Sequence, residues 1–275
     1  MKGVRTSDSD VQRIIAAAAT ACGCDAVAAA TGLSRSTCYR VLRRANLLED
    51  RKTEAPEQPA APRGTDYGDW PPSWAYVVGW TVADGHLSLS PRHVVGWQLA
   101  DRDAVEMIQT AMGVTAAIET CRRTHGTYYR LRLHGRAYTD RFLAAGILPR
   151  KTDRIVVPEM PPDSLPHFLR GVCDGDGCVR IGRARRTLSA KITSCCQSFL
   201  QDVRSRLGYG SVSQSGPRTF DLQFHCRSAV RFLSYIYADC GDLKLRRKWE
   251  RWQAFLATGH RYGSYRRQGH PSGNR

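Results

Sequence analysis

Apolar and polar positions alternate with a helical period in some segments and with a period of two in others, and from residue 70 onward the order of these segments repeats. Each copy begins with an apolar helix and continues as strand, strand, helix, strand, strand, helix. The first copy is predicted to contain a hairpin at 86–99, a helix at 103–112, two strand-like runs and a helix at 136–145. The second is predicted to contain strands at 179–181 and 188–193, a helix at 198–207, strands at 210–213 and 219–225, and a helix at 228–238. The pattern predicts an α+β protein with two αββαββα subdomains.

The helix that opens each copy carries the most informative motif. Residues 77–85 and 169–177 both place a Gly five residues before an Asp-Gly pair. A small residue four positions after the first Gly, Ala83 or Gly175, predicts that the two helices pack with their backbones close together. The Gly after each Asp predicts a left-handed residue that closes the helix. Two carboxylates at neighbouring helix C-termini repel each other, so this pattern favours a bound cation.

These residues resemble the LAGLIDADG homing endonucleases over roughly residues 70–257. The resemblance rests on 79–85, on 168–177, on the Gly-Ile-Leu-Pro-Arg-Lys-Thr stretch at 146–152 and on 243–249. It implies a pseudo-twofold monomer with the motif helices at its centre and two four-stranded sheets that form a saddle over DNA. It also implies that the last acid of each motif, Asp84 or Asp176, holds Mg²⁺ or Mn²⁺. Trp80, Thr81 and Val82 depart from the family pattern, and the second copy has Asp174 where the first has Val82.

Further site residues follow from strand alternation together with the resemblance. Alternation places Gln98 and Lys191 on the outer sheet faces, where the resemblance puts active-site helpers, and Lys151 and Arg246 match each other near the end of each half. The candidate catalytic residues are Asp84, Asp176, Lys191, Gln98, Lys151 and Arg246. The candidate metal-site residues are Asp84, Asp176, Gly85 and Gly177. A metal that lowers the pKa of water fits a site in which the sequence shows no general base.

Polar residues on the strands are candidates for contact with DNA. In 128–134 the basic residues alternate with apolar ones, and in 220–225 the polar residues do the same. Side chains of this kind suit phosphates and the base edges of a major groove. A solvated basic sheet face remains the alternative. The candidate DNA-binding residues of the two subdomains are Arg130, Arg132, His134, Arg183, Arg185, Gln223 and His225.

The first 48 residues form a separate predicted unit. Helices are expected at 10–22 and 26–31, and Ser34 is expected to cap a third helix that ends near Ala45. The stretch 34–40 resembles the start of the recognition helix in the helix-turn-helix of resolvase and invertase tails. A three-helix module with a solvated basic face is the alternative. The candidate DNA-binding residues here are Arg35, Ser36, Tyr39 and Arg40.

Composition agrees with a nucleic-acid partner. The 275 residues contain 41 Lys and Arg against 25 Asp and Glu, a net charge of +16, which attracts polyanions. No apolar run approaches the roughly 20 residues of a membrane span, so we expect a cytoplasmic protein of bacterial or phage type. The ten cysteines include no Cys-x-x-Cys pair, which argues against four-ligand zinc.

The sequence thus predicts a site-specific endonuclease that cuts double-stranded DNA at a long asymmetric site as a monomer. Two alternatives remain open: a DNA-binding regulator of WhiA-like organisation that does not cleave, and an intron maturase that acts on RNA. Because WhiA-type proteins generally lack the motif acids, the presence of both acids favours the enzyme. The expected domains are 1–48, a linker at 49–69, subdomains at 70–160 and 161–257, and a basic tail at 258–275.

Overall fold

The computed structural model describes most of the chain. The described residues are 6–21, 24–45, 47, 70–90, 92–124, 126–182, 187–259 and 262. The chain divides into two units, residues 1–57 and 58–275. The predicted linker at 49–69 and most of the predicted tail at 258–275 lie outside the described residues.

The first unit packs helices α1 (Asp8–Ala18), α2 (Cys24–Thr31) and α3 (Arg35–Arg44) around a small apolar core. The Ser34 hydroxyl accepts a hydrogen bond from the Thr37 backbone N–H at 3.2 Å, so Ser34 caps α3 as predicted. Arg35, Ser36, Tyr39 and Arg40 are exposed on α3. The core residues are Ile14, Val27, Cys38, Val41 and Leu42.

The second unit shows the predicted repeat. Its first half runs α4 (Pro72–Ala83), β1 (Gly85–Ser88), β2 (Val94–Leu99), α5 (Arg102–Ala111), β3 (Glu119–Arg123), β4 (Gly126–His134) and α6 (Arg136–Ala144). Its second half runs α7 (Leu165–Asp176), β5 (Gly177–Ile181), β6 (Leu188–Ser194), α8 (Gln197–Leu207), β7 (Ser211–Gly216), β8 (Thr219–His225) and α9 (Arg227–Tyr237). The 3-10 turns η1 (Lys151–Asp153) and η2 (Pro162–Ser164) join the halves, and α10 (Arg246–Leu256) follows the second.

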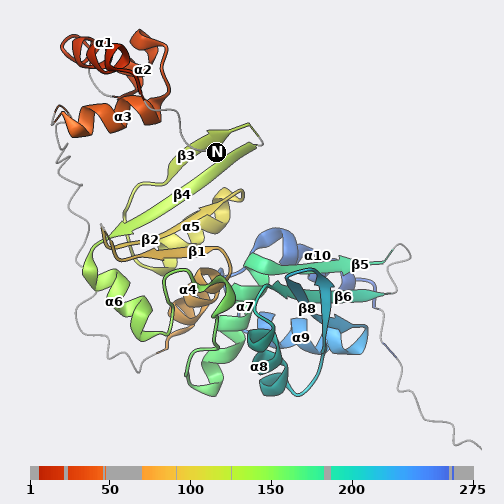
Figure 1. The fold of residues 1–275 in the computed structure, drawn as a ribbon. Helices are drawn as coiled ribbons and strands as arrows, with labels where there is room; N and C mark the ends of the chain where they lie inside the picture. Colours follow the sequence, from red (N-terminus) through yellow and green to blue (C-terminus); the bar gives the residue numbers. More distant parts are fainter. Residues whose placement is uncertain are drawn as a thin grey trace, which may run out of the picture. The chain divides into compact units, whose positions relative to one another are not determined.

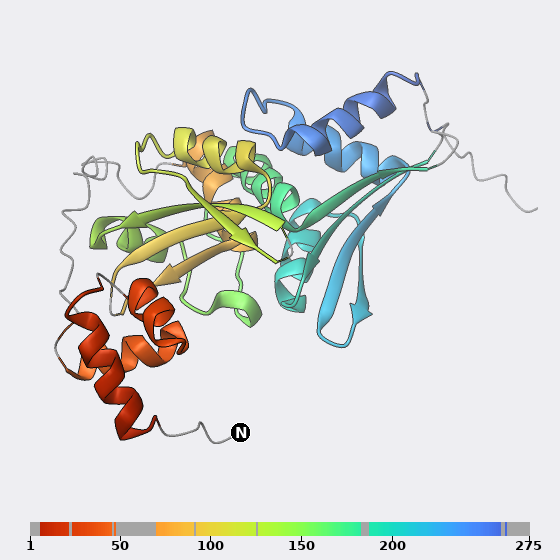
Figure 2. The same ribbon diagram turned by 90° about the horizontal axis from the view of Figure 1, so that it is seen from above.

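The described residues of each half form one antiparallel four-stranded sheet, and the two sheets have equivalent strand orders, β1-β2-β4-β3 and β5-β6-β8-β7. The predicted α+β class and the αββαββα order are therefore confirmed. Figures 1 and 2 show the two sheets on either side of the α4 and α7 pair. The register separates core from surface: Trp97 pairs with Leu131 on the inner face, and Gln98 pairs with Arg130 on the outer face.

Helices cover the inner face of each sheet. In the first half Phe142 of α6 packs on Trp97, with ring centroids 5.9 Å apart. In the second half Phe232 of α9 stacks on Phe224, with centroids 4.1 Å apart. Polar positions of the strands, such as Gln98 and Arg130, alternate with these buried ones and lie on the opposite, outer face. No helix in the described part of the chain is long and apolar enough to cross a membrane.

The glycines after the motif acids do not behave as predicted. Neither Gly85 nor Gly177 is left-handed; Gly177 has φ −97° and ψ 168°, and each glycine leads its helix straight into a strand. Both glycines pack closely against the preceding turn. A Cβ on Gly85 would lie 2.6 Å from Thr81 Cα, and a Cβ on Gly177 would lie 2.3 Å from the Cys173 carbonyl oxygen. These positions require glycine for space.

Candidate active site and nucleic-acid interface

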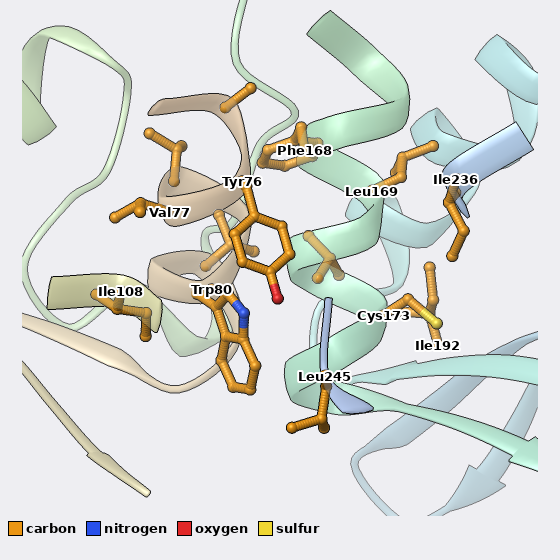
Figure 3. Packing of buried hydrophobic residues seen from close by; sticks show 14 of the residues in the cluster. Tyr76, Val77, Trp80, Ile108, Phe168, Leu169, Cys173, Ile192, Ile236 and Leu245 are labelled. Atoms are coloured by element: carbon orange, nitrogen blue, oxygen red, sulfur yellow. The ribbon is translucent and has the colours of Figure 1, made fainter. Parts of the chain in front are cut away.

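The site is built on the contact between α4 and α7, whose apolar side chains are shown in Figure 3. A Cβ on Gly79 would lie 2.1 Å from the Phe168 carbonyl oxygen, and a Cβ on Gly171 would lie 2.1 Å from the Tyr76 carbonyl oxygen. The same contact is thus made twice, once from each motif. The predicted close approach of the two backbones is confirmed, and it brings the C-terminal ends of the two helices together.

Asp84 and Asp176 lie at those ends. Asp84 follows the last residue of α4, and Asp176 is the last residue of α7. Asp84 reaches across the helix pair, because its Oδ2 lies 3.2 Å from where a Cβ on Gly175 would be. Both carboxylates contact solvent, yet dense protein surrounds each of them. Burial raises the pKa of Asp84, and burial together with the charge of Asp84 raises the pKa of Asp176 to about 6.

Two lysines lie beside this pair of acids. Burial lowers the pKa of Lys151, while the charges of Asp176 and Asp84 oppose that shift. Lys248 is 2% exposed, and its Nζ donates to the carbonyl oxygens of Cys173 at 2.8 Å and Asp174 at 2.7 Å. The ammonium group therefore caps the C-terminal end of α7, where backbone carbonyls lack helical partners.

Lys248 was missed by sequence reasoning, which chose Arg246 from the same stretch. Arg246 has a side chain that is 77% exposed, and its nearest carboxylate is Asp103 at 3.9 Å. A signal for Lys248 was present: it shares one helical face with Leu245 and Trp252, and both of those are buried. A lysine on the apolar face of a helix is a candidate for a buried role.

Asp174 ties the second motif to three other segments. Its buried carboxylate accepts hydrogen bonds from Tyr76 Oη, Tyr237 Oη and the Leu245 backbone N–H, each at 2.8 Å. Tyr76 belongs to α4, so one of these bonds joins the two halves. Because the first motif has Val82 at this place, the arrangement is asymmetric. It fixes the end of α7 only two residues before Asp176.

The other predicted helpers have partners on the outer sheet faces. Lys191 Nζ donates to Asp221 Oδ2 at 2.8 Å, and Thr193 donates to the other oxygen of that carboxylate at 2.7 Å. Burial opposes ionisation of Asp221, but the hydrogen bonds from Lys191 and Thr193 lower its pKa. Gln98 is half-buried on β2, opposite Arg130. The charge of Lys191 is thus balanced within the protein.

The outer faces of the two sheets carry different side chains. On the first, Arg130 and Arg132 both donate to the carboxylate of Glu119 at 2.5 Å. On the second, His225 Nε2 lies 3.2 Å from Gln223 Oε1, and Gln223 donates to Ser213 Oγ at 3.1 Å. Burial and then the charge of Arg132 lower the pKa of His134. Arg183 and Arg185 lie outside the described residues.

The residues present fit a hydrated divalent cation. Mg²⁺ keeps several waters and binds through one or two carboxylates together with substrate phosphates, so it needs no cage of protein ligands. Among the described residues no group of three or more His, Cys, Asp or Glu side chains could hold a metal. Asp84 and Asp176 at the helix ends supply the one or two carboxylates that a hydrated Mg²⁺ requires. A pocket of about 160 Å³ opens beside Asp176, is lined in part by Lys151, Thr193 and Thr219, and has room for several waters.

Solved structures with a distant likeness to this chain include a DUF199/WhiA protein and homing endonucleases. Full-length DUF199/WhiA from Thermatoga maritima is 15% identical with a TM-score of 0.46, covering 74% of this chain and 65% of that one. Meganuclease I-SmaMI bound to uncleaveable DNA is 14% identical with a TM-score of 0.45, covering 67% and 90%. The homing endonuclease I-DmoI in complex with DNA and Ca is 15% identical with a TM-score of 0.44, covering 63% and 92%. The chain spans 65% of the length of the WhiA protein. No protein-family model and no curated protein matches this chain.

Proposed function

We propose that the chain is a metal-dependent DNA endonuclease of the homing type, which binds a long asymmetric duplex site as a monomer and hydrolyses both strands. One observation carries the proposal: Asp84 and Asp176 lie together at the ends of two closely packed helices, with raised pKa values and two lysines beside them. Two carboxylates that repel each other in a partly buried place indicate a site built for a cation.

The residues have distinct roles in this proposal. Asp84 and Asp176 hold the metal. Gly85 and Gly177 provide the space in which each motif helix leads into the strand that follows it. A divalent cation supplies stabilisation of charge on the phosphate and lowers the pKa of water. Lys151 balances negative charge that develops on the nonbridging oxygens. Lys248 holds the end of α7, and so positions Asp176.

The outer sheet faces hold the duplex. Arg130 and Arg132 supply positive charge on the first sheet, where His134 adds a hydrogen-bonding ring, while Gln223 and His225 supply hydrogen-bonding groups on the second. Because the two faces differ, the proposal includes two unlike half-sites. In the separate unit 1–57, the exposed Arg35, Ser36, Tyr39 and Arg40 of α3 are proposed to add contacts outside the central site.

The test is cleavage of a randomised duplex library with Mg²⁺, followed by sequencing of the cut ends. Asp84→Asn and Asp176→Asn are each expected to abolish or cripple double-strand cleavage and to leave affinity in a gel-shift assay largely unchanged, because the carboxylates serve the metal. Asp140→Asn is a matched control: Asp140 is exposed on α6, and this variant is expected to cut like the parent protein.

Three outcomes decide between the candidate functions. Cleavage that survives both Asn substitutions places the active site elsewhere. Tight sequence-specific binding without cleavage by the parent protein, at any Mg²⁺ or Mn²⁺ concentration, favours the non-cleaving regulator. Tighter binding to structured RNA than to duplex DNA of equal length, in the same salt, favours the maturase. Salt must be matched because the phosphate contribution to affinity depends on it.

A further inference from the structure

Glu119 is placed so that it organises two arginines at once. It lies on the edge strand β3, directly opposite Arg130 on β4. One carboxylate oxygen accepts from Arg130 Nη2 and the other accepts from Arg132 Nη2, each at 2.5 Å. Burial opposes ionisation of Glu119, but these two hydrogen bonds lower its pKa. The carboxylate is therefore ionised and bridges both guanidinium groups.

The two arginines keep most of their hydrogen-bonding capacity. A guanidinium has five N–H donors, and within the described part of the chain Glu119 is the only acceptor for Arg130 and Arg132. Their Nε atoms are buried without a partner. Their side chains are 29% and 38% exposed, so part of each guanidinium reaches the outer sheet face. Two fixed cations with free donors point to a ligand with paired acceptors.

We propose that Glu119 is a specificity-determining positioning residue: it holds Arg130 and Arg132 at a fixed separation, so that together they recognise guanines in two base pairs with one pair between them. The inference rests on the proposed binding of duplex DNA. Guanine presents N7 and O6 as paired acceptors in the major groove, and arginine is the side chain that matches them best. Arg130 and Arg132 are two residues apart on one strand.

The spacing of the strand agrees with the spacing of the bases. Residues i and i+2 on an antiparallel strand are about 6.8 Å apart, and two steps along one DNA strand also cover about 6.8 Å. Two long, flexible arginine side chains do not hold their guanidinium groups at such a spacing unaided, because ordering each side chain costs conformational entropy. The bridge from Glu119 orders both arginine side chains in the free protein, so their entropy is already lost before DNA binds. This carboxylate lowers the positive charge of the face, so its contribution is to selectivity rather than to attraction.

The experiment selects duplexes from a randomised library by binding to the full-length protein in EDTA, so that no DNA is cut, and sequences them. The parent protein is expected to select guanine in two base pairs separated by one. Arg130→Ala should relax one of these positions and Arg132→Ala the other, each by roughly 5- to 150-fold in discrimination. Glu119→Gln should relax both positions together, while affinity for unrelated duplex stays the same or rises because a negative charge is lost.

Two further variants separate positioning from charge. Glu119→Asp keeps the charge but shortens the side chain, so it should relax both guanine positions without raising affinity for unrelated duplex. Glu106→Gln removes the carboxylate of another Arg-Glu pair, that of Arg102 on α5, and should leave the base preferences unchanged. Thermal unfolding of each variant checks that the fold is kept.

The inference is overturned if Glu119→Gln retains both guanine preferences, or if it loses only a preference for cytosine at one position, which would mean that Glu119 itself reads a base. It is also overturned if the two arginine substitutions relax no guanine position. A parent protein that shows no affinity for duplex DNA contradicts the proposed function itself, and so the two failures are distinguishable.

Discussion

Gly175→Ala is the sharpest test of how the two motif helices position the acids. The new methyl group would lie 2.4 Å from Ala83 Cβ on the other helix and 3.2 Å from Asp84 Oδ2. Carbon atoms in contact prefer a separation of about 3.5–4.0 Å. The helices must therefore move apart by more than about 1 Å at the level of the acids, or the methyl group must remain compressed.

Two opposing contributions set the change that Gly175→Ala makes to the free energy of unfolding. Overpacking of this kind costs about 1–3 kcal/mol, and replacing Gly by Ala within a helix returns about 1 kcal/mol. Gly175→Ala is therefore expected to lower the free energy of unfolding by up to about 2 kcal/mol. Adding Ala83→Gly moves the methyl group from one helix to the other and removes the clash. The two substitutions should show a favourable coupling energy of about 1–3 kcal/mol.

The measurement is urea unfolding of the parent protein, both single variants and the double variant. Ala144→Gly is the matched control for Ala83→Gly, because Ala144 is also the last residue of its helix and is exposed. Paired with Gly175→Ala, the control should show no coupling. If Gly175→Ala and Ala83→Gly add within about 0.5 kcal/mol, the helices do not approach as closely as described. The reasoning about the site would then fail.

Three further predictions concern Asp174, Asp176 and the N-terminal unit. Asp174→Asn should lower the free energy of unfolding by about 2–4 kcal/mol in urea titrations, because three donors then face an amide instead of a carboxylate; an unchanged midpoint would contradict the hydrogen-bond network. Without metal, the contribution of Asp176 to thermal stability should fall as pH rises from about 4 through 6, because the pKa of Asp176 is raised to about 6 in the folded state and folding favours the protonated form. Asp176→Asn should therefore gain stability relative to the parent protein over this range, by about 1 kcal/mol at pH 7 once solvent screening is allowed for; a difference between variant and parent that does not grow with pH would refute the assignment. Deleting residues 1–60 should weaken DNA binding and shorten the footprint while leaving metal-dependent cutting in place, and an unchanged footprint would mean that α3 does not contact DNA.

The sequence alone determined the features that depend on local pattern. Alternation with a period of two assigned Trp97 and Leu131 to the inner face and Arg130 to the outer face, because a strand allows only two directions for its side chains. The first Gly of each motif and the small residue four positions later, Ala83 or Gly175, predicted a close approach of two helices, because small side chains leave room for one. These features follow from the backbone geometry of single elements, which the order of residues fixes.

Tertiary structure decided the partners. Nothing in the local pattern shows that Glu119 bridges two arginines, that Asp221 binds Lys191, or that Lys248 caps α7. Each of these contacts joins separate elements, and its geometry depends on the register of strands and on how helices pack. The conformation of Gly177 was decided in the same way: the Cys173 carbonyl leaves no room for a side chain, and the extended backbone starts β5 directly. A chemical pattern in sequence identifies which groups are available, and the packing of the elements determines which of them meet.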